Sequence, residues 1–321
     1  MRKGLFVGFD TSNYTTSVAV VNEAGEVLYN GKVPLPVKAG ECGLRQSDAV
    51  FAHVRNLPVL TETLREVLAE GEILSVGCSA RPRSVEGSYM PCFLAGRAAA
   101  GSLAAGVGAS VEEFSHQDGH LMAALYSSGA METLEGKEFV AFHVSGGTTE
   151  VLYVTPTADA YRVECIGGTL DLNAGQAVDR AGVMMGLAFP CGREMERLAG
   201  ENSRPLPKPR VRVKGTECNL SGLQNLAEKL WSEHADAAYV SAYVLSFIGE
   251  TLRAMTAGVD ARYGTIPVVY AGGVMSNRIL QGMLATRADT YFAEPQFSAD
   301  NAAGIALLTR RKYLRASHSE D

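Results

Sequence analysis

The stretch FVGFDTSNYTTSVAVV, residues 6–21, decides the fold when it is aligned with FVAFHVSGGTTEVLYV, residues 139–154. The two segments are related by a constant offset of 133 (139 − 6) along the 321-residue chain. The identical pairs are Phe6 and Phe139, Val7 and Val140, Phe9 and Phe142, Ser12 and Ser145, Thr15 and Thr148, Thr16 and Thr149, Val18 and Val151, and Val21 and Val154. Because self-similarity at a fixed spacing indicates a repeated structural unit, the sequence predicts two lobes built on one pattern.

Each copy has the pattern of a β-hairpin, in which a β-rich apolar run is followed by a polar turn and a second alternating run. The turns contain small residues that expose hydroxyl and backbone N–H groups, such as Ser145 and Gly146 in the second copy. Two such turns, facing each other across a cleft, would hold the phosphates of one nucleotide from opposite sides. The simpler interpretation, in which each turn only reverses the chain, stays open for either hairpin alone.

The rest of the chain alternates helical and strand patterns, which predicts an α/β fold. Helices are expected over residues 46–70, 90–105, 121–127, 236–262 and 301–314, and further strands over residues 74–79, 111–114, 162–166 and 266–271. The segment RPLPKPRVRVKG, residues 204–215, breaks the pattern with three prolines and several basic residues. We therefore expect a basic surface loop there.

The bulk composition is that of an ordinary globular protein, with 46% hydrophobic and 20% charged residues. The formal net charge of −6 gives no general attraction to a phosphate backbone, so any contact with nucleic acid must come from a local basic patch. The cysteines, including Cys42, have no C-x-x-C spacing and are expected to be reduced. The chain starts without the pattern of a signal peptide and has no membrane-spanning run, so we expect a cytoplasmic protein.

The motif HQDGH places His116 and His120 four residues apart, directly after the strand expected over residues 111–114. On one helical turn both imidazoles would point the same way, as a shared metal ion requires. The alternative is a pair of surface or cap histidines, since this spacing also arises by chance. A metalloprotease has a glutamate directly after its first histidine, and Gln117 at that position cannot act as a general base. Peptide hydrolysis is therefore disfavoured.

Asp300 is a candidate for a third metal ligand, since SADNAAGIALL places it with Asn301 at the start of the last helix, but nothing in this segment by itself indicates metal binding. The alternative role of an aspartate in this place is a simple N-cap. Two imidazoles and one carboxylate suit Fe or Zn, whereas Mg²⁺ prefers oxygen ligands. This ligand set argues against a sugar kinase.

Two further segments are candidates for a nucleotide site. VVYAGGVMSN ends a buried-type strand with Gly272 and Gly273, so a flat base could approach the backbone closely there. DLNAGQAVDRAGVMMGLAFPCG contains Asp171, Asp179 and Gly192, and an aspartate near a helix could accept hydrogen bonds from ribose hydroxyls. Either segment could equally be an ordinary turn or a solvated helix charge.

The motifs occur in a fixed order that resembles the TsaD family, the threonylcarbamoyl-transferases formerly called glycoprotease or Gcp. The matching segments, from Gly8 to about Leu308, are DTS, HQDGH, VSGGTTE, DLNAGQAVDR, FPCG, LSGL, AGGVMSN and ADNAA. The resemblance implies a duplicated fold of the actin, Hsp70 and sugar-kinase type. It also implies lobes at residues 1–132 and 133–299, with residues 300–321 packing back on the first lobe.

The resemblance further implies transfer of a threonylcarbamoyl group from its adenylate to the N6 amine of a tRNA adenosine next to the anticodon. Partners would be tRNA and the proteins of a TsaB- and TsaE-like complex, or further copies of the chain. A divalent transition metal would bind His116, His120 and Asp300. An adenine nucleotide would contact the positions that match the family's site, namely Ser145, Gly146, Asp171, Gly175, Asp179, Gly192 and Asn277.

The chain departs from the family pattern in its first turn. The family motif T-S-C-D-E-T has an acidic pair where this chain has Tyr14 and Thr15, which leaves Asp10, Thr11 and Ser12 as the catalytic candidates. A glycine- and proline-containing loop of the family is replaced by ARPRSVEGSYMPC, which introduces Arg81, Arg83 and Glu86. These arginines could bind a different anionic group or could be solvated surface charges.

Three more positions lose a titratable group relative to the family. Thr148 stands where the family has histidine, Gln176 where it has glutamate, and Gln224 where it has lysine. Because all three expected metal ligands are retained, these losses indicate a divergent paralogue. Two hypotheses follow, namely a carbamoyl-type transferase and a regulatory or scaffold protein that binds metal and nucleotide.

Overall fold

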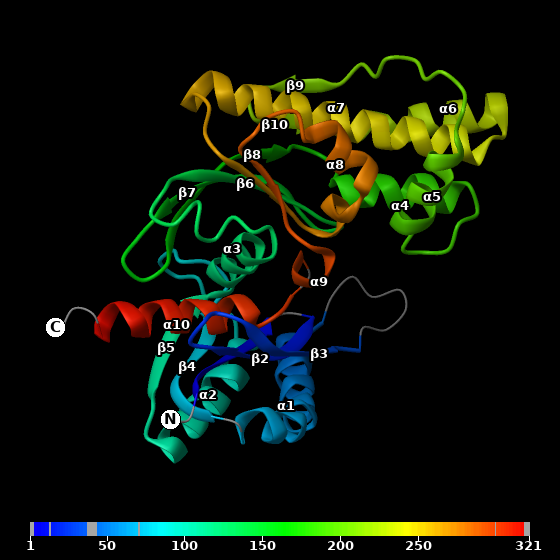
Figure 1. Ribbon diagram of the computed structural model, residues 1–321. Helices are drawn as coiled ribbons and strands as arrows, with labels where there is room; N and C mark the ends of the chain where they lie inside the picture. The colour runs from blue at the N-terminus through cyan, green and yellow to red at the C-terminus, as the bar shows by residue number, and fades with distance from the viewer. Residues whose placement is uncertain (1–2, 13, 37–43, 70, 299, 318–321) are drawn as a thin grey trace. The chain divides into compact units, whose positions relative to one another are not determined.

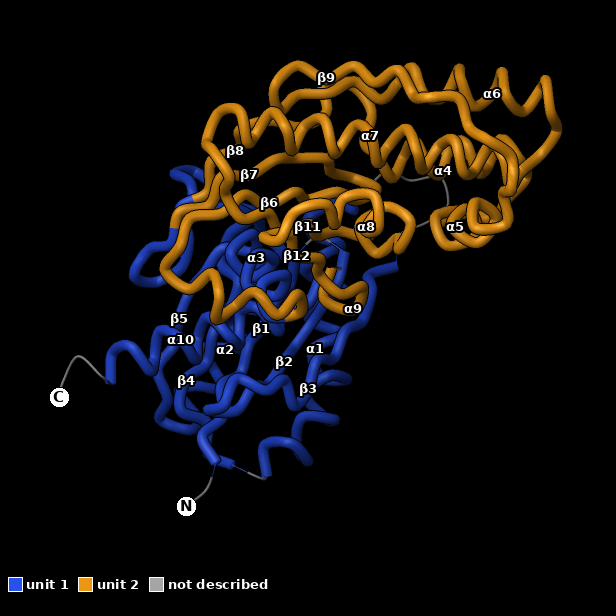
Figure 2. Tube along the Cα trace, turned by 45° about the horizontal axis from the view of Figure 1, so that its top comes forward, with its two compact units in different colours: residues 1–126, 156–162, 299–321 blue, residues 127–155, 163–298 orange. Residues whose placement is uncertain are grey.

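The computed structural model describes residues 3–12, 14–36, 44–69, 71–298 and 300–317, so Cys42 and residues 318–321 lie outside the described part. The chain forms two mixed β-sheets with helices packed on them, and the α/β prediction is confirmed (Figure 1). It divides into two compact units (Figure 2). Unit 1 consists of residues 1–126, 156–162 and 299–321, and unit 2 of residues 127–155 and 163–298.

The sheet of unit 1 has five strands in the order β3-β2-β1-β4-β5. Their bounds are β1 Lys3–Ser12, β2 Thr15–Asn22, β3 Val27–Pro34, β4 Gly71–Arg81 and β5 Ser110–Ser115. β2 lies antiparallel to β1 and β3, whereas β1, β4 and β5 run parallel. β1 is buried from Gly4 onward because helices cover both faces of the sheet. An apolar run without strict alternation is the expected sequence of such a strand.

Four helices accompany this sheet: α1 Gln46–Leu68, α2 Phe93–Val107, α3 His116–Ser127 and α10 Ala303–Ser317. α1 and α2 pack on one face and α10 on the other (Figure 1). Glycines allow α10 to approach closely. A Cβ at Gly8 would lie 2.5 Å from the backbone nitrogen of Ala306, and one at Gly304 would overlap the carbonyl oxygen of Gly119 in α3. The backbones of α10, β1 and α3 are therefore in direct contact.

The sheet of unit 2 repeats the same strand order with two strands added at one edge, β12-β11-β6-β7-β8-β10-β9. The bounds are β6 Phe139–Val144, β7 Thr149–Pro156, β8 Tyr161–Thr169, β9 Arg212–Lys214, β10 Glu217–Asn219, β11 Val268–Ala271 and β12 Thr290–Phe292. In the first hairpin Phe6 pairs with Val21, and in the second Phe139 pairs with Val154. The two hairpins share one register, so the predicted duplication is confirmed.

The helices of unit 2 are α4 Ala174–Met184, α5 Gly192–Glu201, α6 Gly222–His234, α7 Ala237–Tyr263, the 3₁₀ helix η1 Gly273–Ser276, α8 Arg278–Leu284 and α9 Pro295–Ser298. The long helix α7 contributes much of the apolar core. Tyr270 of β11 is fully buried and stacks on Phe292 at 5.3 Å between ring centroids. Among the described helices, none is long and apolar enough to cross a membrane.

The predicted basic loop over residues 204–215 is wrong at its end, because Arg212–Lys214 forms the edge strand β9. Val213 of this strand pairs with Cys218 of β10. Among the described strands, the other side of β9 is an unpaired edge of the sheet. Basic residues on either side of an inward valine are typical of an exposed edge strand. The proline-containing first part of the segment stays without regular structure.

Candidate metal centre and nucleotide turn

The candidate metal centre of unit 1 lies at the carboxyl ends of its parallel strands. β1 ends at Ser12, β4 at Arg81 and β5 at Ser115, and α3 begins immediately afterwards at His116. Ligand sites of open α/β sheets occur at this edge, where side chains that follow neighbouring strands converge. The sheet therefore brings Asp10, Arg81 and His116 to one edge of unit 1.

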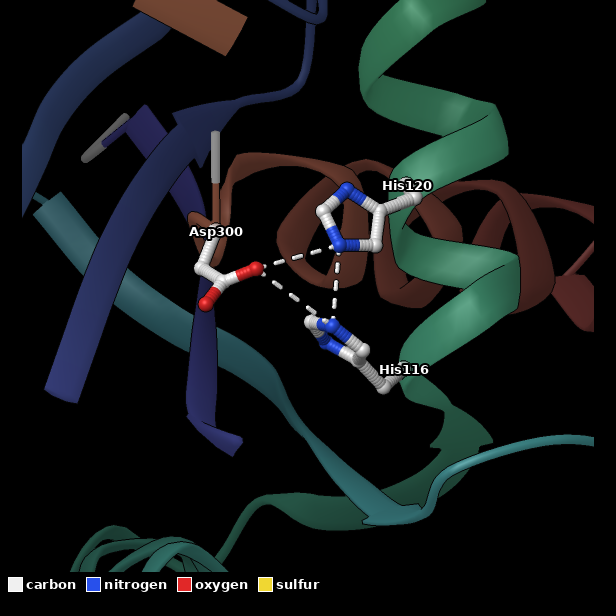
Figure 3. Close-up of side chains that lie close together, drawn as sticks. All are labelled: His116, His120 and Asp300. Carbon is white, nitrogen blue, oxygen red and sulfur yellow. Dashed lines mark hydrogen bonds and ion pairs between the residues drawn. The ribbon is translucent and has the colours of Figure 1, made fainter. Parts of the chain in front are cut away.

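His116, His120 and Asp300 come together in this place (Figure 3). Nε2 of His116 lies 2.8 Å from Nε2 of His120, and Oδ1 of Asp300 lies 3.3 Å from Nε2 of His120 and 3.6 Å from Nε2 of His116. The three ligand atoms are within 4.8 Å of one another. The histidines are one turn apart on α3, whereas Asp300 comes from the segment before α10.

Asp300 is not the N-cap of the last helix, which begins later than the sequence predicts, at Ala303. The side chain of Asn301 accepts the backbone N–H of Ala303 and so takes the capping role. The carboxylate of Asp300 is left to face the two histidines (Figure 3). This arrangement follows from the close packing of Gly304 against Gly119, which lies between the two histidines in the sequence.

Asp10 orients the first histidine. Its Oδ2 lies 2.6 Å from Nδ1 of His116, and its Oδ1 accepts hydrogen bonds from the Ser12 backbone N–H and the Ser79 hydroxyl. A carboxylate that holds Nδ1–H of a histidine presents the lone pair on Nε2 to a metal ion. The donor set and this second carboxylate fit a divalent transition metal. Asp10 is buried and both of its carboxylate oxygens are hydrogen-bonded, and its catalytic role stays a prediction.

The two carboxylates also set the charge of the centre. Burial lowers the pKa of His116, but Asp10 and Asp300 outweigh that effect and raise the pKa to about 10. Burial raises the pKa of Asp300, but hydrogen bonds and charge attraction from His116 and His120 hold it well below its usual range. The arrangement therefore favours a positive charge among these three side chains, whether a proton or a metal ion.

The other two catalytic candidates of the first turn have local roles. The Thr11 hydroxyl donates to the carbonyl oxygen of Cys92 and accepts the backbone N–H of Gly96, which fastens the start of α2 to β1. The Ser12 hydroxyl is buried and has no hydrogen-bond partner within the described part of the chain. Neither contacts the three expected metal ligands by a hydrogen bond among the described residues.

Sequence reasoning missed Asp118, the central residue of HQDGH. Its Oδ2 accepts the backbone N–H and hydroxyl of Ser115 and the hydroxyl of Ser84. Asp118 thus caps the start of α3 and ties it to the loop after β4. An acidic residue in the first turn of a helix often stabilises the helix start, and this pattern could have predicted the role of Asp118 from the sequence.

In unit 2, the expected phosphate turn packs on the first turn of α4. The Ser145 hydroxyl accepts the N–H groups of Gly147 and Thr148, and the Gly175 N–H donates to the carbonyl oxygen of Ser145 at 3.1 Å. A Cβ at Gly175 would lie 2.6 Å from Cα of Gly146. Glycine is therefore required at residue 175 for this contact, and Ser145, Gly146 and Gly175 form one cluster.

Three other nucleotide candidates have side-chain oxygens that accept protein N–H groups. Asp171 accepts from the backbone of Leu172 and Leu220 and from the Ser221 hydroxyl. Asp179 accepts the N–H of Cys191 at the start of α5, and Asn277 caps α8 through the N–H of Leu280. These carboxylates and this amide hold helix starts and a loop in place. Their contacts to a nucleotide stay predictions.

The glycine candidates fall into two groups. Gly272 has a φ of +99° and its Cβ would collide with the backbone of Val144, so it permits close packing of β11 on β6. Gly192 and Gly273 have open space where a side chain would be, which leaves their backbone accessible to a ligand. Contacts of these glycines to a nucleotide stay predictions.

Two of the residues that differ from the family pattern form hydrogen bonds with neighbouring side chains or backbone. Gln176 completes a capping box with Asn173 at the start of α4. Gln224 accepts a hydrogen bond from Arg180 and donates to Glu228. A lysine at residue 224 would place a second positive charge against Arg180, so the glutamine fits this surrounding better.

Comparison with known proteins identifies the family. The chain matches the TsaD family, described as tRNA N6-adenosine threonylcarbamoyltransferase, over residues 47–307. A protein of that description from Streptococcus suis (strain 05ZYH33) is 29% identical over 324 residues, which covers 98% of this chain and 94% of that protein. One from Streptococcus pneumoniae serotype 2 (strain D39 / NCTC 7466) is 30% identical over 327 residues, covering 95% and 91%.

Solved structures confirm the predicted actin, Hsp70 and sugar-kinase type of fold. Component A of the Acidaminococcus fermentans (R)-2-hydroxyglutaryl-CoA dehydratase has a TM-score of 0.54 at 14% identity, over 97% of this chain and 99% of that chain. The ROK family glucokinase of Streptomyces griseus has a TM-score of 0.52 at 12% identity, covering 95% and 98%. These likenesses establish the fold, and the family match over most of the sequence establishes that this chain belongs to the TsaD family.

Proposed function

We propose that this chain is a metal-dependent transferase that moves a threonylcarbamoyl, or a related carbamoyl, group from its adenylate to N6 of a tRNA adenosine next to the anticodon. The observation that carries the proposal is the convergence of His116, His120 and Asp300 in a chain of the TsaD family. Two imidazoles and one carboxylate suit Fe or Zn. A metal ion bound there supplies Lewis-acid polarisation of the carbonyl under attack.

The chain's own residues supply binding and orientation. Asp10 fixes the ring of His116, so that Nε2 faces the ligand position. In unit 2, the turn that begins at Ser145 offers glycine backbone to an anionic phosphate. The amine of the acceptor then attacks the carbonyl carbon and AMP departs, so no covalent enzyme intermediate is needed.

The test is transfer by the purified, metal-loaded protein. With threonylcarbamoyl-adenylate and unmodified tRNA, we expect the modified nucleoside in hydrolysed tRNA, alone or after addition of TsaB- and TsaE-like partner proteins. His120→Ala should remove the product because it removes a metal ligand. The absence of product from metal-loaded wild-type protein under all of these conditions would overturn the proposal.

A second candidate function is a regulatory or scaffold role that uses metal and nucleotide binding without transfer. The uncharged residues Tyr14 and Thr15 favour it, because the family pattern has an acidic pair there. Complementation separates the two functions. Rescue of a strain that lacks the tRNA modification by the unaltered chain would exclude the regulatory role. Rescue only after Tyr14→Asp with Thr15→Glu would support it.

A further inference from the structure

Arg81 ends β4 at the same sheet edge as the candidate metal centre. In the parallel pairing of β4 with β5, Arg81 lies opposite Ser115, the residue immediately before His116. Neighbouring strands are ~4.8 Å apart, and an extended arginine side chain is longer than this spacing. The backbone of Arg81 therefore lies one strand away from the residue that precedes His116, a separation that an extended arginine side chain can span.

The backbone around Arg81 is fixed on both sides. Before it, β4 is paired with β5, and after it the carbonyl oxygen of Pro82 accepts the N–H of Gln117 at 3.1 Å. Two residues further on, the Ser84 hydroxyl donates to Asp118 at 2.8 Å. The loop is thus hydrogen-bonded twice to the helix turn that bears the histidines. This anchoring gives Arg81 a fixed origin before any ligand binds.

Arg81 also lacks a protein partner in the described part of the chain, although it is partly buried. Other arginines of the chain form ion pairs with carboxylates, as Arg97 does with Glu113 and Arg287 with Asp260. Partial removal of a charge from water without a counter-charge is unfavourable. A planar guanidinium in this situation is suited to a two-point contact with a carboxylate or a phosphate.

A second basic residue interacts electrostatically with one of the same ligands. Lys32 of β3 is partly buried; burial lowers the pKa of its ammonium group, and the charge of Asp300 acts in the opposite direction. The first turn adds no opposing charge at Tyr14 or Thr15. With a divalent metal bound, this edge of unit 1 would therefore attract an anion.

We propose that Arg81 binds an oxyanion of the substrate, a carboxylate or a phosphate, beside the metal centre. This inference rests on the proposed function, because the proposed donor carries both groups, one on threonine and one on the adenylate. The loop ARPRSVEGSYMPC, which replaces the family's glycine- and proline-containing loop, then has a binding role of its own.

The test measures binding of two probes to metal-loaded protein by calorimetry. AMP reports the phosphate and N-carbamoyl-L-threonine reports the carboxylate. Arg81→Gln should weaken one of the two about tenfold or more, since hydrogen bonds to charged groups contribute ~1.5–3 kcal/mol. The affinity of Arg81→Lys for that probe should lie between those of wild type and Arg81→Gln, because lysine keeps the positive charge and loses the planar, two-point hydrogen bonding of the guanidinium. Arg83→Gln is the matched control, since Arg83 is exposed in the same loop.

The metal content and thermal midpoint of each variant establish that it is folded and loaded. The probe that loses affinity identifies which oxyanion Arg81 binds. Equal affinities of wild type and Arg81→Gln for both probes, at equal metal content, would overturn the inference and leave the proposed transfer untouched. Failure of the wild type to hold metal or to transfer the group would instead count against the proposed function.

Discussion

Asp10 is buried at the end of β1, with one carboxylate oxygen on His116 and the other on Ser12 and Ser79. Because both oxygens are engaged, the side chain cannot rotate away without breaking several hydrogen bonds in a place that water does not reach. Its effect on the metal centre is therefore exerted through the ring of His116.

Asp10→Asn should lower the affinity for Zn²⁺ or Fe²⁺ about 10- to 100-fold, the usual cost of losing the residue that orients a metal-bound histidine. Competition with a chelator of known affinity measures this change. Asp48→Asn is the control, because Asp48 is exposed in the first turn of α1. Unchanged affinity in folded Asp10→Asn protein would refute the orienting role.

Asp171 makes a pH-dependent contribution to stability. Burial raises its pKa, but hydrogen bonds from Ser221, Leu220 and Leu172 outweigh that effect and hold the pKa well below its usual range. A depressed pKa in the folded state means that the stabilisation is full above the ordinary aspartate pKa of about 3.9 and is lost as the pH falls below it.

Asp171→Asn should accordingly be less stable than wild type at neutral pH, and the difference should shrink as the solution is acidified below about pH 4. Urea unfolding at a series of pH values gives both free energies. A difference that stays constant into acid would show that the carboxylate charge is not what ties residue 171 to the loop before α6.

At the scale of elements, the crossing of α10 and α3 brings Asp300 to the histidines. Gly304 and Gly119 let the two helix backbones touch, and Gly8 lets α10 lie directly on β1. Helices with side chains at these contacts would be held further apart, since interaxial distance depends on the residues at the crossing. The glycines thus connect packing to the geometry of the metal centre.

Gly304→Ala should destabilise the protein by ~1–3 kcal/mol, because the added methyl group has no room between backbones. It should also weaken metal binding by moving Asp300 away from His116 and His120. Gly282→Ala is the control, because that residue lies in α8 with open space around it and alanine favours a helix. Calorimetric titration with Zn²⁺ and urea unfolding test both parts, and wild-type metal affinity in Gly304→Ala would contradict the argument.

At the scale of the whole molecule, the expected metal ligands lie in unit 1, whereas Ser145, Gly175 and the other nucleotide candidates lie in unit 2. Each ligand is therefore expected to stabilise the protein through a different set of residues. A ligand that binds only the folded state at 100 times its dissociation constant adds ~2.7 kcal/mol to the free energy of unfolding.

Zn²⁺ and AMP should each raise the thermal midpoint of the wild type. His120→Ala should lose the effect of Zn²⁺ and keep that of AMP, whereas His234→Ala, an exposed histidine at the end of α6, should keep both. Differential scanning calorimetry with each ligand measures these shifts. Equal stabilisation of wild type and His120→Ala by Zn²⁺ would argue against the proposed metal centre.

The sequence by itself determined the features that depend on local pattern. In each hairpin, an apolar run, a turn of small polar residues and a second, alternating run identified the two strands. The constant offset of 133 (139 − 6) between the two copies identified the duplication. The four-residue spacing of His116 and His120 sufficed to place both rings on one helix face. These inferences succeeded because hairpins and helix faces are defined by residues close together in the chain.

Only the tertiary structure decided which distant residues meet. Asp300 is suggested by the family resemblance, but its approach to His116 depends on the packing of α10 against α3. Residue spacing does not predict that Asp10 bonds to His116, nor that Asp171 bonds to the loop before α6. Hydrogen-bond partners far apart in the chain are determined by how helices and strands pack. The type of a polar side chain does not by itself tell whether its hydrogen-bond partner is a ligand or another residue of the protein.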